Sequence, residues 1–329
     1  MTQGFHDTPV LALCGGVGGA KLALGLYRTL NADRLTLVVN TGDDFKHLGL
    51  HISPDMDTVL YTLAERNNKE TGWGRENETW TFMSVLKELG GEDWFQLGDG
   101  DLALHVERTR RLAAGQRLSE VSEFFRQHLG LGARIVPMSD DPVQTIVHTP
   151  DGALPFQAYF VRDRCQHTVK EINFEGAECA APTPVFVEQL EDPSLRAVVI
   201  CPSNPYLSVD PILALPGIRD ALRTCVAPVI AVSPIVRGEA LKGPTTKIMR
   251  ELGVARSNAA IAHHYEGIID GLIIDEADSA DLDTITLPCI ASATIMENLN
   301  DRIRLAQSVL DFGERLDSRR GDARNGTVS

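Results

Sequence analysis

Short apolar runs recur along the chain, and each ends in polar or turn-forming residues. Because these runs are apolar throughout rather than alternating, they predict strands buried on both faces of a parallel sheet. Helix-length segments such as Ala20–Leu30 and Gly217–Thr224 lie between them. This order predicts an α/β fold, a Rossmann-like doubly wound parallel sheet. The predicted strands are Val10–Leu13, Leu35–Asn40, Ala197–Cys201, Val229–Val232 and Gly271–Asp275.

The middle of the chain has a different pattern. Residues 57–129 show amphipathic helix patterns without a clear buried strand, and Ala133–Arg162 alternates around the turn signal Pro150-Asp151-Gly152, which predicts an antiparallel hairpin. We therefore predict a Rossmann-like nucleotide-binding core of residues 8–56 and 194–314. A mixed helical and antiparallel insertion domain, residues 57–193, is expected to cap it. Residues 315–329 lack an apolar period and are predicted to form a flexible tail.

Composition narrows the function classes. The 329 residues include 31 Lys and Arg against 45 Asp and Glu, and the net charge of −14 disfavours binding to nucleic acid or anionic membranes. No run of 18 apolar residues or signal-like start is visible, so we predict a cytoplasmic protein. The six cysteines form no CxxC pair, which gives no indication of a zinc site.

A glycine-rich turn follows the first predicted strand. Gly15, Gly16, Gly18 and Gly19 precede Lys21, so backbone N–H groups at a helix start can face a phosphate. The turn lacks the last glycine of the dinucleotide fingerprint, and Leu22 stands where a P-loop needs Ser or Thr. An ordinary NAD enzyme or ATPase is therefore disfavoured. The alternative is a tight turn that binds no ligand.

An acidic cluster follows the second predicted strand. Asp43 and Asp44 come directly after it, and Asp55 and Asp57 follow within fifteen residues. Such carboxylates repel each other unless a cation lies among them, and Mg²⁺ prefers oxygen ligands. We assign magnesium to Asp43 and Asp57. The alternative for single residues is structural, with Asp55 as a helix cap and Asp43 as a turn residue.

Two further features suit a planar, phosphorylated ligand. Ser203 and Asn204 lie between two prolines after a buried strand, so their polar groups can recognise a base or phosphate, although a stiffened turn is the alternative. Trp73, Trp80 and Trp94 lie in the predicted cap. They can pack in a core or form a wall for a flat ring.

Together these motifs make the chain resemble the 2-phospho-L-lactate transferase family, the CofD-type enzymes of coenzyme F-420 biosynthesis. The resemblance extends from about residue 10 to residue 310 in the family's order. The stretches that carry it are CGGVGGAKL, VVNTGDD, LHISPDMDTVLYTL, GWGRENETW, WFQLGDGDLALH, PMSDDPVQT, FQAYFVR, CPSNPYLSVDPILALPGI, AVSPIV, KGPTTKIM and IIDEAD.

The resemblance implies a transferase that moves a phosphorylated three-carbon acid from a guanosine diphosphate-linked donor to the ribityl hydroxyl of the deazaflavin Fo and releases GMP. It implies Mg²⁺ as cofactor and a partner guanylyltransferase that supplies the donor, and a homodimer is a possible assembly. By position, Asp57 and Gln96 would contact Fo, while the glycine turn and the Ser203-Asn204 pair would hold the guanine nucleotide. Asp43 and Asp57 are the catalytic candidates, and one carboxylate of the cluster would accept the hydroxyl proton.

Two positions depart from the family's pattern. The family often has a basic residue at Gln96 and usually has GDRD where this chain reads Gly98-Asp99-Gly100-Asp101. Because a lost cation and a small glycine would change which acid is accepted, Gly100 is the candidate for donor selectivity. The donor can be the 2-phospholactyl, enolpyruvyl or 3-phosphoglyceryl form. The competing class is a non-catalytic regulatory protein of the same superfold that binds a nucleotide-sugar.

Overall fold

The computed structural model describes residues 7–241 and 243–325. At its centre is a seven-stranded sheet whose neighbouring strands all pair in parallel. β1 lies inside the sheet, with β2 on one side and β9 on the other, which is the doubly wound arrangement. The predicted fold class is confirmed. From edge to edge the strands are β14 (Cys289–Ser292), β13 (Gly271–Asp275), β10 (Val229–Val232), β9 (Ala197–Ile200), β1 (Val10–Cys14), β2 (Leu35–Val39) and β5 (Arg134–Pro137).

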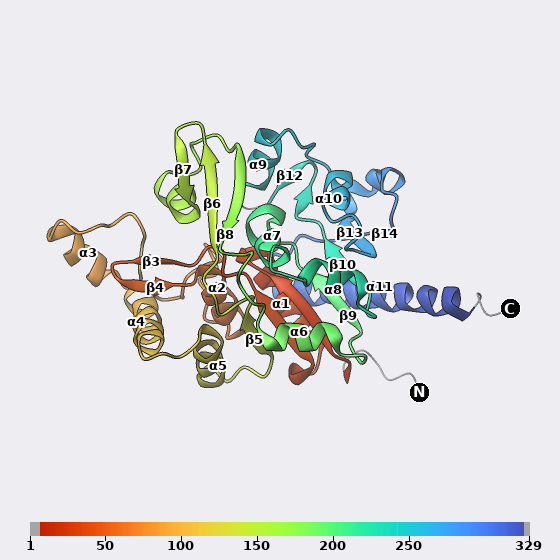
Figure 1. Cartoon of the computed structure of the whole chain (residues 1–329), viewed down its shortest axis with the longest axis horizontal. Coiled ribbons are helices and arrows are strands. Elements are labelled where there is room, and N and C mark those ends of the chain that lie inside the picture. Colours follow the sequence, from red (N-terminus) through yellow and green to blue (C-terminus); the bar gives the residue numbers. More distant parts are fainter. Residues whose placement is uncertain (1–6, 242, 326–329) are drawn as a thin grey trace.

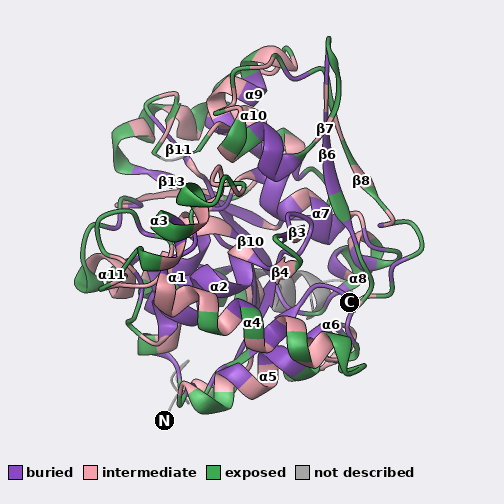
Figure 2. Ribbon diagram, turned by 90° about the vertical axis from the view of Figure 1, so that its left-hand side faces the viewer, coloured by how far each residue is buried: buried purple, intermediate pink, exposed green. Residues whose placement is uncertain are grey.

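Two apolar cores flank the sheet, because successive side chains of a strand point to opposite faces. Leu11 and Leu13 of β1 belong to one core, and Val10 and Ala12 belong to the other. Both faces are therefore covered, which explains why the strands read as unbroken apolar runs. Figure 2 shows the buried strands at the centre, with helices α4 and α5 exposing their outer turns.

Helices cover both faces of the sheet (Figure 1). Apolar residues of α1, α2, α5 and α11 share the core with Val10, and those of α6 to α10 share the core with Leu11. The helices are α1 (Gly16–Thr29), α2 (Pro54–Leu63), α3 (Thr81–Glu88), α4 (Asp99–Ala113), α5 (Leu118–His128), α6 (Pro184–Glu191), α7 (Asp210–Leu213), α8 (Ile218–Thr224), α9 (Thr245–Glu251), α10 (Asn258–His264) and α11 (Leu299–Asn325).

Two antiparallel units stand outside the main sheet. In Figure 1 the hairpin of β3 (Phe45–His47) and β4 (Leu50–Ile52) projects to the left beside α3, and the sheet of β7 (Gly152–Pro155), β6 (Gln144–Thr149) and β8 (Glu171–Glu175) stands above the core. The hairpin predicted around Pro150-Asp151-Gly152 is confirmed as β6 and β7. The remaining elements are β11 (Ile235–Val236), β12 (Glu239–Ala240), the 3-10 segments Ala32–Arg34 and Glu276–Thr284, and the π-helical turns Ala158–Arg162 and Pro205–Val209.

The structure corrects two boundaries. The segment 57–193, predicted as a separate cap, contributes β5 to the main sheet and most of α2 to one of its cores, because Val59, Leu60 and Leu63 pack there. The tail predicted from residue 315 is helical as far as Asn325, and Leu316 is buried in the same core, so that core extends the helix beyond the expected end. Residues 326–329 lie outside the described part of the chain.

Candidate functional site

The glycine turn and the Ser203 loop meet where the strand order reverses, between β1 and β9. Ser203 Oγ accepts a hydrogen bond from Gly15 N (3.1 Å) and donates one to Gly15 O (2.9 Å). A Cβ on Gly18 would overlap the Pro202 carbonyl oxygen, and a Cβ on Gly19 would overlap Ser203 Oγ. These glycines therefore allow the two loops to pack together. In open α/β sheets this is the region where ligands bind.

A carboxylate of the protein occupies the start of α1. Gly16 has a positive φ of 61°, and its N–H donates to Asp55 Oδ1 at 2.6 Å. Asp55 thus takes the position at the first helical N–H group where we expected a phosphate. Lys21 is also engaged, because its Nζ donates to the Met296 carbonyl oxygen at 2.8 Å.

Asn40 connects the acidic residues that follow β2. Its Nδ2 donates to Asp55 Oδ2 (3.0 Å) and Asp43 Oδ1 (3.3 Å), and its Oδ1 accepts from Gly42 N (2.8 Å). Gln157 donates to the other oxygen of Asp43 at 3.2 Å. Burial, reinforced by Asp55, raises the pKa of Asp43 well above its usual value, and burial raises the pKa of Asp55 to about 6. The hydrogen bonds of these carboxylates thus come from uncharged groups.

Asp57 is placed in a different cluster. Both of its oxygens accept hydrogen bonds from the buried Arg108 guanidinium, at 3.1 Å for Nη1 to Oδ2. His105 Nδ1 lies 3.6 Å from Asp57, and His105 Nε2 lies 3.2 Å from Asp101. One ligand atom each from Asp57, Asp101 and His105 lies within 4.8 Å of the others, a geometry that can hold a metal ion. Arg108 already supplies a positive charge to Asp57 there.

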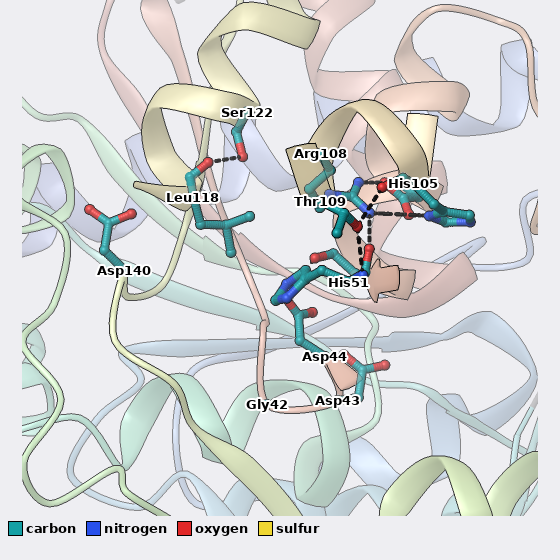
Figure 3. A network of polar contacts seen from close by, with 12 residues as sticks. Gly42, Asp43, Asp44, His51, His105, Arg108, Thr109, Leu118, Ser122 and Asp140 are labelled. Atoms are coloured by element: carbon teal, nitrogen blue, oxygen red, sulfur yellow. Dashed lines mark hydrogen bonds and ion pairs between the residues drawn. The ribbon is translucent and has the colours of Figure 1, made fainter. Parts of the chain in front are cut away.

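Asp44 points to a third set of partners (Figure 3). Its Oδ2 accepts from Ser53 Oγ at 2.6 Å and lies 3.1 Å from His51 Nε2. Its Oδ1 is buried and has no hydrogen-bond partner among the described residues. The four clustered aspartates of the sequence therefore have distinct environments, and only Asp43 and Asp55 share a donor group.

A cavity of about 920 Å³ opens beside this loop, within the size range of small-molecule sites. Figure 3 shows Asp44 and His51 on one side of it and Leu118 and Asp140 on the other. Trp94 lines it, whereas Trp73 and Trp80 are about half exposed elsewhere, at 51% and 48%. The cavity is lined by Thr41, Asp44, Phe45, Lys46, His51, Trp94, Leu112, Gln116, Arg117, Leu118, Asp140, Asp141, Pro142, Val143, Gln144, Pro155, Gln157, Ala158, Glu175 and Gly176.

None of the predicted site residues is among those that line this cavity, and Gln96 and Gly100 have other surroundings. Gln96 is exposed, and its Nε2 donates to the Asp93 carbonyl oxygen within its own loop. Gly100 opens no additional space, because a Cβ there would overlap the Arg75 guanidinium, and its N–H donates to Glu78 Oε2 at 2.6 Å. The side chains of Arg75 and Glu78 occupy the volume beside Gly100, and its role in donor selectivity stays a prediction.

The two polar atoms of the Asn204 side-chain amide have different roles. Its Oδ1 accepts from the N–H groups of Tyr206 and Leu207 and so begins the π-helical turn Pro205–Val209. Its Nδ2 is buried without a hydrogen-bond partner in the part of the chain that the structure describes. Leaving a buried amide N–H group without a hydrogen bond costs free energy, so Asn204 Nδ2 is suited to donate a hydrogen bond to an acceptor atom of a ligand.

The structure is that of a Rossmann-type α/β protein, with the candidate site residues gathered at the carboxyl edge of the parallel sheet. The sequence profile of the 2-phospho-L-lactate transferase CofD family matches residues 10–287, so the chain belongs to that family and is a transferase. This favours a transferase over the regulatory nucleotide-sugar-binding protein considered above.

Relatives named either phosphoenolpyruvate transferase or 2-phospho-L-lactate transferase match nearly the whole chain. A phosphoenolpyruvate transferase from Kitasatospora aureofaciens is 37% identical over 317 residues, 93% of this chain and 98% of the relative. A 2-phospho-L-lactate transferase from Methanocaldococcus jannaschii is 38% identical over 307 residues, 92% of this chain and 97% of the relative. A solved structure of a UPF0052 family member from Bacillus halodurans has a TM-score of 0.61 at 16% identity and covers 93% of this chain and 100% of its own, which supports the fold. Within residues 7–241 and 243–325, no helix is both long and apolar enough to cross a membrane.

The sequence reasoning missed several site residues. Arg108, His105 and Asp101 were not predicted to form a cluster, because nothing in their spacing points to Asp57, 51 residues before Arg108. His51 and Gln157 lie within the stretches LHISPDMDTVLYTL and FQAYFVR that carry the family resemblance, but neither residue was assigned a role from the sequence. The i, i+4 spacing of Asp101 and His105 was a further signal, since such residues share a helix face.

Proposed function

We propose that the protein transfers a phosphorylated three-carbon acid from a guanosine diphosphate-linked donor to the ribityl hydroxyl of Fo, with release of GMP. The observation that carries this proposal is the family match over residues 10–287, which includes the walls of the cavity beside the acidic loop. The relatives' names point to enolpyruvyl and 2-phospholactyl groups as donors. The 3-phosphoglyceryl form is a further donor to test.

The acceptor is proposed to bind in the cavity. Trp94 offers a flat apolar surface to a ring system, while Asp44, His51 and Gln157 offer polar groups near one end. A mostly apolar cavity with a few polar side chains is typical of sites for small cofactors. Asp57 then acts on this site indirectly, through Arg108 and the backbone of His51.

The guanine nucleotide is proposed to bind at the junction of the glycine turn and the Ser203 loop. The unpartnered Asn204 Nδ2 supports this placement, since a base or phosphate oxygen would satisfy it. Because Asp55 already accepts from Gly16 N, the phosphates would use N–H groups later in the first turn of α1.

A Mg²⁺ ion fits one part of the predicted metal site. Asp43 and Asp55 would hold it, because both are buried, share Asn40 as donor and form no ion pair with a cationic side chain among the described residues. Asp57 does not fit, since Arg108 occupies both of its oxygens. When bound, Mg²⁺ supplies charge neutralisation for the donor's phosphates.

We expect GMP release that requires both Fo and Mg²⁺. EDTA should abolish turnover and excess Mg²⁺ should restore it, and Asp43→Asn should lower the rate by about a hundredfold, the scale of a lost ligand in a preorganised site. Asp220→Asn, the same change at an exposed ion pair, is the matched control. GMP release that proceeds equally without Fo, or in EDTA, would contradict the proposal.

A further inference from the structure

One cavity-facing group has the geometry of a general base. His51 on β4 lines the cavity with its side chain 24% exposed, and its Nε2 lies 3.1 Å from Asp44 Oδ2. Its other ring nitrogen, Nδ1, has no hydrogen-bond partner among the described residues. A carboxylate that accepts from Nε2–H leaves the Nδ1 lone pair available for a proton.

Surrounding groups hold this His–Asp pair in place. Ser53 Oγ donates to Asp44 Oδ2 at 2.6 Å, on the same oxygen that faces His51. The backbone N–H of His51 donates to Thr109 Oγ1 at 2.8 Å, and its carbonyl oxygen accepts from Arg108 Nη1 at 3.4 Å. The histidine is therefore anchored to α4 by its backbone and oriented by Asp44 through its ring, as a nucleophile-activating base requires.

The neighbouring carboxylates are less suited to the same task. Asp57 is paired with Arg108, and Asp101 accepts from Tyr61 Oη at 2.7 Å. Asp43 and Asp55 accept hydrogen bonds from Asn40, and neither lines the cavity. Asp44 lines it but already has His51 and Ser53 on one oxygen.

We propose that His51, oriented by Asp44, accepts the proton of the acceptor's hydroxyl during transfer; this rests on the proposed function. The hydroxyl oxygen forms a bond to the donor phosphorus that carries the acid, and its proton passes to His51 Nδ1. The bond from that phosphorus to the bridging oxygen breaks, and GMP leaves with the bonding electron pair. Solvent then removes the proton from His51.

Three charged groups lie near His51. Asp44 faces its ring, Lys46 lies opposite it in the β3–β4 hairpin, and Arg108 contacts its carbonyl oxygen. Because only the neutral imidazole accepts a proton, activity should fall on the acidic side of the pH profile. The transfer step should lose this acidic limb when the imidazole is removed.

The test compares kcat of the wild type and His51→Asn with Fo, the donor and Mg²⁺ across pH. We expect kcat to fall about a hundredfold or more, the acidic limb to disappear, and added imidazole to restore at least tenfold, with KM for Fo within about threefold. His263→Asn, at an exposed histidine paired with Glu266, should behave as wild type. Asp44→Asn, which keeps the imidazole, should lower kcat at least tenfold.

The outcomes separate this assignment from the proposed function. No Fo-dependent product from the wild type contradicts the proposed function itself. Product from the wild type and His51→Asn at rates within threefold contradicts only the role of His51, as does a slow variant that keeps the acidic limb and gains nothing from imidazole. Thermal unfolding and Fo titration of each variant establish that the compared proteins are folded and bind the acceptor.

Discussion

The carboxylate of Asp55 lies at the start of α1, where its charge, the N–H of Gly16 and the Asn40 amide meet. Burial raises its pKa to about 6, against the lowering effect of those two hydrogen bonds. An ordinary aspartate ionises near pH 4 when unfolded. The unfolded chain therefore releases this proton at a lower pH than the folded chain does.

This difference predicts a pH-dependent stability. Below about pH 4 the carboxyl is protonated in both states, so it carries no penalty; as pH rises through 6, the folded state loses up to about 3 kcal/mol relative to the unfolded state. We expect the free energy of unfolding of the wild type, minus that of Asp55→Asn, to fall by roughly this amount between pH 4 and pH 7. Urea unfolding in EDTA measures it. A flat difference would show that Asp55 is solvated, and Asp220→Asn is the control expected to be flat.

At the residue scale, the sequence predicted which residues gather at the site better than it predicted the hydrogen-bond partners of each side chain. The glycines, the aspartates and the Ser203-Asn204 pair do gather along the carboxyl edge of the sheet, because turns after parallel strands meet there. Which aspartate faces which donor depends on side chains from distant elements, such as Arg108 for Asp57 and Gln157 for Asp43. The space expected at Gly100 was absent for the same reason, since Arg75 fills it from another segment.

At the element scale, close approach of helices organises one face of the sheet. Gly25 of α1 packs against α11, and a Cβ there would overlap the carbonyl oxygen of Arg302. A backbone carbonyl cannot move aside as a flexible side chain can, so a Cβ at Gly25 would force α1 or α11 to shift. The first turn of α1 and the C-terminal helix are therefore coupled through packing.

We expect Gly25→Ala to lower the free energy of unfolding by about 1–3 kcal/mol, the usual cost of overpacking. The matched control is Gly313→Ala in α11, whose added Cβ would lie 3.1 Å from the flexible Ile230 Cδ1. That variant should be near neutral or stabilised by up to about 1 kcal/mol, since alanine favours helix over glycine. Chemical denaturation of both variants checks this. Equal effects would mean that α11 moves away freely.

Interior strands of the sheet with purely apolar patterns were predictable, and the two edge strands were not. β1, β2, β9, β10 and β13 match the predicted runs because each is buried on both faces. β14 lies at the sheet edge with all four residues only half-buried, so its sequence carries a weak signal. β5 begins at the exposed Arg134, and this polar residue made it resemble part of the following hairpin.

At the scale of the whole molecule, the cavity lies where the core and the antiparallel additions meet. Its walls come from the loop after β2, the β3–β4 hairpin, the α4–α5 connection and the β6–β8 sheet. A net charge of −14 surrounds a site proposed for an anionic donor, so local neutralisation has to come from a cation and from helix N–H groups. The family match over residues 10–287 spans both parts.

The central claim is tested most directly by the mass of the product formed from Fo. The full chain is incubated with Fo, Mg²⁺ and an equimolar mixture of 2-phospholactyl, enolpyruvyl and 3-phosphoglyceryl donors made by the partner guanylyltransferase. We predict that mass spectrometry shows Fo extended by one phosphorylated acid, with one GMP released per product, and the mass identifies the preferred acid. Recovery of unmodified Fo from every donor, with the protein folded and Mg²⁺ present, would contradict the proposed function.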